Sequence, residues 1–281
     1  MIHVANPIGA ALDLSAPIDN NGRFDYTNSS SEATLEYRGS GWSAWAGGLV
    51  GSREVSWRRT TDDPGEDVNR DSTGAVAGFS LRLAKGINGS LEYRHGTFEE
   101  YVFRTDPETV DRVTLRVRSQ LGGGWSLTAH GRFERADNPA EVASLDHRSD
   151  AGGVGLAWAT KNGDAALGVD VSVLSLTTDT GIVLPGGGAD LSRYDLSLTT
   201  LTAYGRTTLG KVRLQGSVTR VEDSGNTWPV SSWNAALRAG LELAAHTELA
   251  AYVQHWSYNE DRSNLDDFKV TRYGVALSWS F

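Results

Sequence analysis

Cysteine is absent from the 281-residue chain. Without it the chain forms no disulfide bond, no thiolate metal site and no thiol nucleophile, and it attaches no haem covalently. Long hydrophobic runs are absent too, because no segment approaches the ~18 apolar residues of a membrane-spanning helix. The chain has seven prolines, one methionine and a net charge of −9. Together with a mean hydropathy of −0.34, this average composition is typical of a soluble acidic protein.

The order of the residues contradicts that average. Apolar side chains almost never recur at helical spacing, whereas alternation at every second position runs along nearly the whole chain. Val113, Leu115 and Val117, for example, alternate with threonine and arginine. Residues 127–133, 167–173, 212–218 and 273–281 repeat this pattern. Each such strand has one apolar and one polar face, and averaging the two hides the apolar face.

Two kinds of connection separate the alternating segments. Short turns fall at residues 39–41, 85–89, 122–124, 162–164, 209–211 and 244–247. Longer polar connections fall at residues 58–73, 105–109, 136–149, 179–190, 222–231 and 259–267. Each repeat of about 40 residues then holds two strands, whereas a propeller blade of that length holds four strands of ~5 residues. The pattern therefore favours an up-and-down meander of long strands.

The fold class that follows is all-β, a transmembrane up-and-down antiparallel β-barrel that forms one domain over residues 1–281. Strands of roughly 11–16 residues suit a tilted crossing of a bilayer. We predict about fourteen of them, with twelve and sixteen as the alternatives, and an even number brings both termini to the short-turn side. The predicted strands are residues 3–15, 22–38, 41–57, 74–84, 89–104, 110–121, 125–135, 150–161, 165–178, 192–207, 211–221, 232–243, 247–258 and 268–281.

Aromatic residues gather near both ends of the predicted strands. Outward-facing aromatic side chains collect at the two levels of the lipid headgroups in barrels of this kind. We place Trp42, Trp125, Trp158, Tyr204, Trp279 and Phe281 at the short-turn level. We place Trp57, Tyr101, Phe103, Phe133, Tyr194, Trp233, Trp256 and Tyr273 at the long-loop level. Two such belts support the membrane interpretation.

The last ten residues carry the most specific local pattern. Tyr273, Gly274, Leu277, Trp279 and the terminal Phe281 sit in an alternating strand. This segment resembles the C-terminal assembly signal of bacterial outer-membrane β-barrels. The resemblance implies a porin-like architecture in the Gram-negative outer membrane, with short periplasmic turns and longer extracellular loops. Its implied partners are membrane lipid, lipopolysaccharide and the barrel-assembly machinery. Residues 1–7 lack the pattern of a secretory signal peptide, so we expect a mature chain with an added methionine.

If the apolar side chains face lipid, their alternates line a lumen. The predicted lining residues are Arg82, Glu92, Arg94, Arg112, Arg116, Arg118, Arg132, Glu134, Asp170, Arg193, Asp195, Arg213, Arg238, Glu242 and Arg272. Arginine dominates this wall from residue 82 to 132, whereas residues 150–178 offer mostly glycine, alanine and serine. Two interpretations stay open: cross-strand ion pairs that stiffen the barrel, and a field that orients or selects anionic solutes.

The sequence gives little support for metal binding, catalysis or nucleic-acid binding. The charged connection at 58–73 is interpreted as a solvated loop, with a gate over the mouth or calcium capture as alternatives, although Ser72 stands where a calcium loop needs glycine. None of the six histidines has a serine or aspartate at a telling spacing, so we predict no catalytic residue, no metal ligand and no cofactor. The net charge opposes nucleic-acid binding.

The sequence thus predicts a passive pore for small hydrophilic solutes or ions, and not an enzyme. One alternative is a sheath that houses a lumen-filling partner, such as a multihaem cytochrome or a secreted polymer. An autotransporter-type translocator ranks behind both. Short loops offer no evident trimer latch, which favours a monomer.

Overall fold

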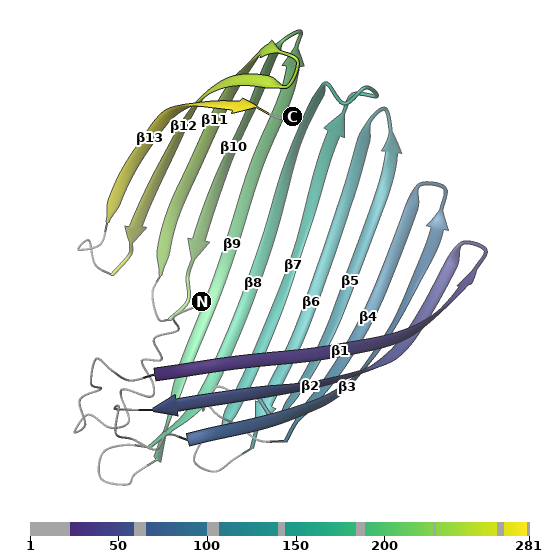
Figure 1. The fold of residues 1–281 in the computed structure, drawn as a ribbon, viewed down its shortest axis with the longest axis vertical. Helices are drawn as coiled ribbons and strands as arrows, with labels where there is room; N and C mark the ends of the chain where they lie inside the picture. The colour runs from purple at the N-terminus through teal and green to yellow at the C-terminus, as the bar shows by residue number, and fades with distance from the viewer. Residues whose placement is uncertain are drawn as a thin grey trace.

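The computed structural model describes residues 23–58, 66–99, 107–139, 144–183, 189–226, 229–262 and 267–279. In these ranges the chain forms thirteen antiparallel strands, each hydrogen-bonded to the next in sequence order, in a single sheet (Figure 1). The strands are β1 (Arg23–Gly39), β2 (Trp42–Arg58), β3 (Glu66–Ala84), β4 (Ile87–Phe98), β5 (Thr109–Gly122), β6 (Trp125–Asn138), β7 (Leu145–Ala159), β8 (Ala165–Val183), β9 (Ala189–Leu209), β10 (Val212–Asp223), β11 (Val230–Ala244), β12 (Thr247–Glu260) and β13 (Phe268–Trp279). The described ranges contain no helix that could span a membrane.

The all-β, up-and-down prediction is confirmed. Each predicted strand from residue 22 onward corresponds to one strand of the sheet, and all six predicted short turns join consecutive strands. The predicted strand at 3–15 lies outside the described residues. The first two short turns each place a glycine in the left-handed region, Gly41 at φ 85° and Gly86 at φ 84°, which other residues adopt only with strain.

Several of the longer connections differ from the prediction. The predicted strand at 89–104 is too long, because β4 ends at Phe98, whereas other connections are shorter than predicted. Residues 66–73 belong to β3, so the predicted loop at 58–73 is wrong over half its length, and β7 and β8 likewise extend into the predicted loops at 136–149 and 179–190. The pairing of β2 with β3 continues to Trp57 and Glu66, which satisfies the backbone although side chains on both faces are polar there. Because Asp67 and Asp71 lie within this strand, the calcium-loop alternative is wrong.

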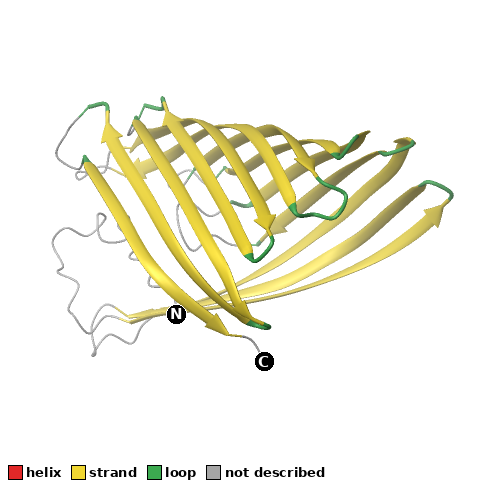
Figure 2. Cartoon of the chain, turned by 90° about the horizontal axis from the view of Figure 1, so that it is seen from above, coloured by secondary structure: helices red, strands yellow, loops and turns green. Residues whose placement is uncertain are grey.

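The sheet coils into an open trough. β1, β2 and β3 run across the direction of β4 to β9 (Figure 1), and from above the strands wrap around a hollow (Figure 2). Among the described residues no pairing joins β1 to β13.

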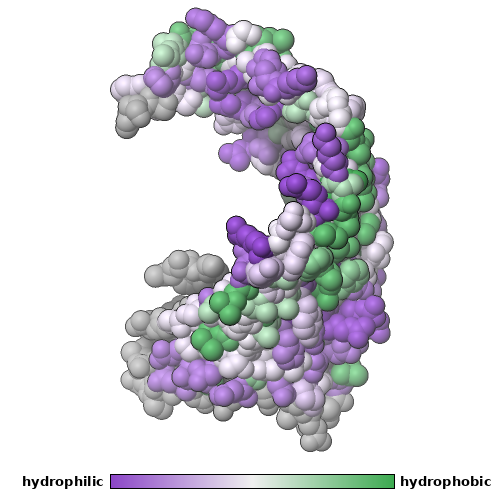
Figure 3. Space-filling view, turned by 90° about the vertical axis from the view of Figure 1, so that its right-hand side faces the viewer, coloured by the Kyte–Doolittle hydropathy of each residue, from purple (hydrophilic) through white to green (hydrophobic). Residues whose placement is uncertain are grey.

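The two faces of the sheet differ in polarity. Cross-strand partners share a face, and the pairing places Leu115, Phe133, Val171 and Leu277 on one face with most other large apolar side chains. Hydrophobic side chains lie along the convex side and hydrophilic ones reach into the hollow (Figure 3). Protein atoms bury only five apolar side chains in the described part: Val55, Val76, Ala136, Leu145 and Ala250. A single layer with so little core requires hydrocarbon against its convex face.

The aromatic belt is confirmed only in part by the pairing. At the short-turn end of the convex face, the ring centroids of Tyr37 and Trp42 lie 5.4 Å apart, and those of Trp42 and Phe79 lie 6.2 Å apart. The outward placement of Tyr194, Tyr204 and Trp256 is wrong. These three pair with Thr178, Gly168 and Asn234, all of which belong to the concave face. Tyr101, Phe103, Phe281 and the side chain of Trp57 lie outside the described residues.

Candidate pore wall

Thirteen of the fifteen predicted lining residues lie on the polar face of the sheet. Two ion pairs show that this face is the concave one. Arg94 of β4 reaches Glu32 of β1 at 3.0 Å, although β2 and β3 lie between them, and Arg213 of β10 reaches Glu248 of β12 at 3.3 Å across β11. Side chains converge in this way only on the inside of a curved sheet.

Arg193 and Asp195 are the two exceptions, and their predicted inward placement is wrong. Arg193 pairs with Asp179, and the register of β8 with β9 continues without a bulge to Val169 opposite Ala203. Both residues therefore share the convex face with the lipid-facing side chains. They lie at the long-loop end, where Arg193 contacts Asp195 at 3.2 Å and Asp179 at 4.0 Å. Charged side chains are allowed there because the strand has passed beyond the hydrocarbon.

The arginine wall comprises the six arginines between residues 82 and 132 on the concave face of β3 to β6, and the three glutamates in contact with them. Its arginines are Arg82, Arg94, Arg112, Arg116, Arg118 and Arg132, and its glutamates are Glu32, Glu92 and Glu134. Six positive charges and three negative ones leave a formal charge of +3.

Half of these arginines are neutralised within the wall. Glu134 has 14% of its side chain exposed, and its Oε2 accepts from Arg112 Nε at 2.6 Å and from Arg132 Nη2 at 2.5 Å. Arg94 Nε donates to Glu92 at 2.9 Å, in addition to its contact with Glu32. The interpretation of the wall as a set of stiffening ion pairs therefore describes these three arginines.

The other three arginines of the wall have no carboxylate partner among the described residues. In the described part of the chain Arg82, Arg116 and Arg118 form no ion pair, and all three are exposed. Arg116 and Arg118 line a hollow of about 800 Å³ together with Arg94, Arg112 and Arg132. Their uncompensated charge faces the space that the trough encloses.

The side chains that line the concave face next to the arginine wall are small. On β7 the concave side chains from 151 to 159 are alanine and glycine only, as the sequence predicts for this region. Asp170 of β8 lies over Gly155, where a Cβ atom would clash with its carboxylate. The concave face of β7 therefore carries no large side chain of its own between residues 151 and 159.

The sequence analysis missed several charged residues of the inner face, among them Glu32, Arg206, Glu248 and Arg70. Glu248, 14% exposed, accepts from Arg238 at 2.5 Å and from Arg213 at 3.3 Å, so it neutralises one of the two positive charges of this pair. Glu248 and Gln254 are six positions apart on β12 and therefore share a face, which could have revealed that Glu248 points inward. Arg70 is 1% exposed; it donates to the Pro107 carbonyl, and its guanidinium lies 4.2 Å from the Phe98 ring centroid. Sequence analysis had placed it in a loop.

The histidines and carboxylates of the described residues are the groups from which a metal site would be built. The described residues hold no group of three or more histidines or carboxylates that could bind a metal ion. His130 faces inward as predicted, opposite Arg116, while His95 lies on the convex face 2.9 Å from Asp111.

Comparison with known proteins adds the fold class. No protein-family model matches the chain, and no curated protein matches it in sequence. The siderophore receptor PirA of Acinetobacter baumannii matches 92% of this chain with a TM-score of 0.65 and 9% identity. An anion-selective porin from Comamonas acidovorans (TM-score 0.44, 11% identity, 92% of this chain and 96% of the porin) and OmpT of Vibrio cholerae (0.42, 12%, 93% and 98%) are more distant.

The chain spans about half of PirA, 49% of its length. At this identity the likeness shows the fold alone. The chain therefore has the fold of an outer-membrane β-barrel protein, a class whose setting is the bacterial outer membrane.

Proposed function

We propose that the chain forms a water-filled, porin-like channel through which small hydrophilic solutes or ions diffuse passively, with a preference for anions. The observation that carries this proposal is the uncompensated arginine of the concave face, Arg82, Arg116 and Arg118. The proposal assigns the chain no chemical reaction, because transport of this kind needs only a hydrated path and a field.

An open path is expected from the size of the sheet. Eight strands close into a barrel that wall side chains just fill, and this sheet has thirteen. The lumen therefore holds water unless a partner occupies it.

The preference for anions follows from charge and dielectric. A wall of one sign, backed by lipid of low dielectric constant, raises the local concentration of counter-ions. The formal +3 of the arginine wall attracts anions even though the whole chain carries −9. The preference should weaken with increasing salt, since the Debye length falls to about 3 Å at 1 M.

The test is a planar-bilayer measurement on the refolded chain. Under a salt gradient, we expect stable conductance steps and a reversal potential with the sign of anion flux. The double variant Arg116→Glu/Arg118→Glu changes the charge of the arginine wall from +3 to −1 and should reverse that sign.

A matched control places the same change in charge on the outside. Arg135 and Arg220 lie on the convex face, opposite Arg148 and Trp233 respectively. Arg135→Glu/Arg220→Glu should keep the native reversal potential. An equal shift in both double variants would show that the arginine wall does not set the field.

A second function is favoured by the small-residue lining of β7. A sheath for a partner protein or polymer chain needs a smooth wall. The concave residues of 151–159 are alanine and glycine, and the side chains of His130 and Asp170 lie flat over two of these glycines. A barrel that inserts into the bilayer but never conducts would support this sheath and contradict the open pore.

A further inference from the structure

A second feature of the concave face lies on β9 to β12, apart from the arginine wall. Two tyrosines there lie across the sheet instead of standing upright. Tyr204 covers Gly168 of β8, where a Cβ atom would come within 2.5 Å of its Cζ and Oη. Tyr252 covers Gly274 of β13 in the same way, at 2.6 Å from Oη. Each of the two tyrosines is 40% exposed, so each rests on glycine and remains open to the hollow.

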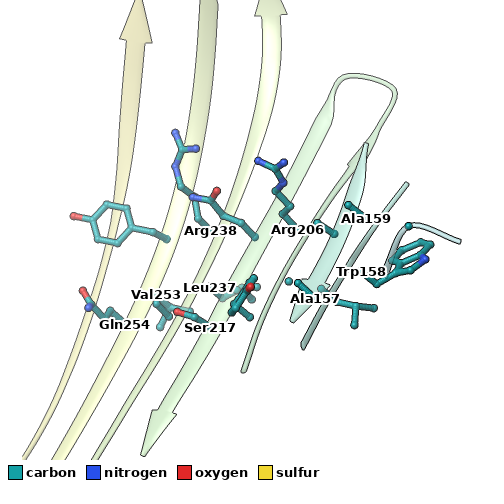
Figure 4. Close-up of a pocket in the computed structure, with 18 of the residues that line it drawn as sticks. Ala157, Trp158, Ala159, Arg206, Ser217, Leu237, Arg238, Val253 and Gln254 are labelled. Atoms are coloured by element: carbon teal, nitrogen blue, oxygen red, sulfur yellow. The ribbon is translucent and has the colours of Figure 1, made fainter. Parts of the chain in front are cut away.

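Polar side chains fill the space between the two rings. The cross-strand pairing aligns Arg206, Gln215, Arg238 and Tyr252 in one row across β9, β10, β11 and β12. Gln254 lies next to this row on β12, and these residues line a hollow of about 650 Å³. Arg206 and Arg238 reach the same way from the sheet (Figure 4).

Arg206 and Arg238 differ in their ion-pair partners. Arg238 is anchored to Glu248 at 2.5 Å, which leaves the rest of its guanidinium to face the hollow. Within the described ranges Arg206 has no ion-pair partner, and neither Arg206 nor Gln215 makes a side-chain hydrogen bond. The donors and acceptors of this row are therefore available to a solute.

Flat aromatic faces, amide groups and a free guanidinium form a specific combination. An aromatic face offers apolar area with a negative quadrupole, against which the C–H face of a sugar ring packs. Glutamine binds hydroxyl groups as both donor and acceptor, and arginine binds a carboxylate through two parallel hydrogen bonds. Neighbouring strands lie ~4.8 Å apart, so the backbones that carry the two tyrosines are separated by about 14 Å along the sheet. The rings themselves lie farther apart, because Tyr204 leans over β8 and Tyr252 leans over β13, and this span exceeds one sugar ring.

We propose that the β9–β12 wall is a binding platform for an acidic oligosaccharide, with Tyr204 and Tyr252 stacking on sugar rings, Gln215 and Gln254 binding hydroxyls, and Arg206 binding a carboxylate. This proposal rests on the proposed channel, for which it names a class of solute. The platform makes the passage of such a solute a binding event and not free diffusion alone.

The experiment uses trigalacturonate as the acidic probe and maltotriose as the neutral one. Each is added to one side of a bilayer that holds a single channel of the refolded chain. Trigalacturonate should interrupt the current in a concentration-dependent way, and maltotriose should do so at least fivefold more weakly. Equal interruption by both sugars would overturn the role of Arg206, and interruption by neither would overturn the platform while leaving the channel intact.

Variants separate the platform from the general field. Tyr204→Ala and Tyr252→Ala should each weaken trigalacturonate binding about fivefold, the effect of losing one stacking contact, and Tyr252→Phe should retain it. Arg206→Gln should reduce the preference for the acidic sugar to the part that the field of the arginine wall supplies. Trp45→Ala is the matched control, since Trp45 also lies over a glycine, Gly78, but on β2 and outside the platform. A loss of binding in Trp45→Ala equal to that in Tyr252→Ala would overturn the assignment.

Two further measurements test the platform if a tyrosine variant does not fold or if the barrel does not conduct. Gly168→Ala forces the Tyr204 ring off the sheet without removing it and should weaken binding as Tyr204→Ala does. Should the barrel prove silent, binding of trigalacturonate to the folded chain in detergent is measured by titration calorimetry. Heat of binding that disappears in Tyr252→Ala would support the platform without a channel, and its absence in the native chain would contradict the platform.

Discussion

At Glu134 one carboxylate holds two arginines of neighbouring strands. Arg112 reaches it from β5 and Arg132 reaches it from its own strand, β6. With 14% of the side chain exposed, this carboxylate is shielded from solvent more than its two partners, whose exposed fractions are 37% and 49%. The three charges act as a unit of net charge +1, so the glutamate sets both the rigidity of the wall and its charge.

Glu134→Gln should therefore have two effects. Loss of the charge-assisted hydrogen bonds should lower the free energy of unfolding by about 1–2 kcal/mol, measured by urea unfolding from lipid vesicles. The anion preference should rise at the same time, because the wall changes from +3 to +4. A variant with lower stability and unchanged reversal potential would place Glu134 outside the conducting path.

Glycine at position 78 makes room for an inward aromatic ring. A Cβ atom there would overlap the indole of Trp45. Gly78→Val should disturb packing at a cost of about 1–3 kcal/mol and reduce the yield of folded, heat-modifiable barrel. Gly48→Ala is the control: Gly48 lies on the convex face, where the nearest atom to a new Cβ is 3.7 Å away, and its yield should match the native chain.

At the scale of the strand, alternation decides which face a residue occupies. Val171 and Ser172 are neighbours on β8, and they face lipid and lumen respectively. Val171→Arg places a charge against hydrocarbon and should cost about 2–4 kcal/mol, whereas Ser172→Arg should fold normally and increase the anion preference. Refolding yield and reversal potential check both. Equal losses in the two variants would contradict the assigned faces.

Alternation also explains how far the strands could be predicted from the sequence. Residues within the hydrocarbon must alternate, so the strands from residue 22 onward and the six short turns follow from the sequence. Beyond the hydrocarbon both faces are wet, the alternation disappears, and β3 was therefore predicted to start eight residues late. Charge fails as a guide there for the same reason: Arg193 and Asp195 face outward. Only unbroken pairing reveals their face.

The sequence predicted many of the residues that line the inner wall, but not which of them contact one another. Parity identified Arg112, Arg116 and Arg132 as inward, but the ion pair of Arg94 with Glu32 joins strands far apart in sequence and depends on the curvature of the sheet. Glycines that receive aromatic rings have no pattern of their own in the sequence. The tyrosine platform was missed because Tyr204 was assigned to the lipid side.

For the whole molecule, the open edges of β1 and β13 present a problem of hydrogen bonding. Unpaired backbone groups in hydrocarbon cost several kcal/mol each, so a bilayer requires that the edges be closed. We propose that the predicted strand at 3–15 takes part in this closure. The chain has no native cysteine, so single cysteines at Leu12, Asp13 and Leu14 would be unique labels.

A membrane-embedded strand should protect these positions in alternation. We expect a water-soluble maleimide to label Asp13→Cys, and to label Leu12→Cys and Leu14→Cys at least tenfold more slowly in lipid vesicles. Rapid labelling at all three would show that this segment is not part of the barrel wall.

The scarcity of internal packing has a consequence for how the chain reaches its final form. Because its own atoms bury so few apolar side chains, collapse in water offers the chain little gain, and the main decrease in free energy comes when the convex face meets hydrocarbon. Folding and insertion are then a single thermodynamic event. The unfolded chain, with its modest hydropathy and dispersed apolar residues, remains suited to crossing an aqueous compartment and waits for a bilayer to complete its structure.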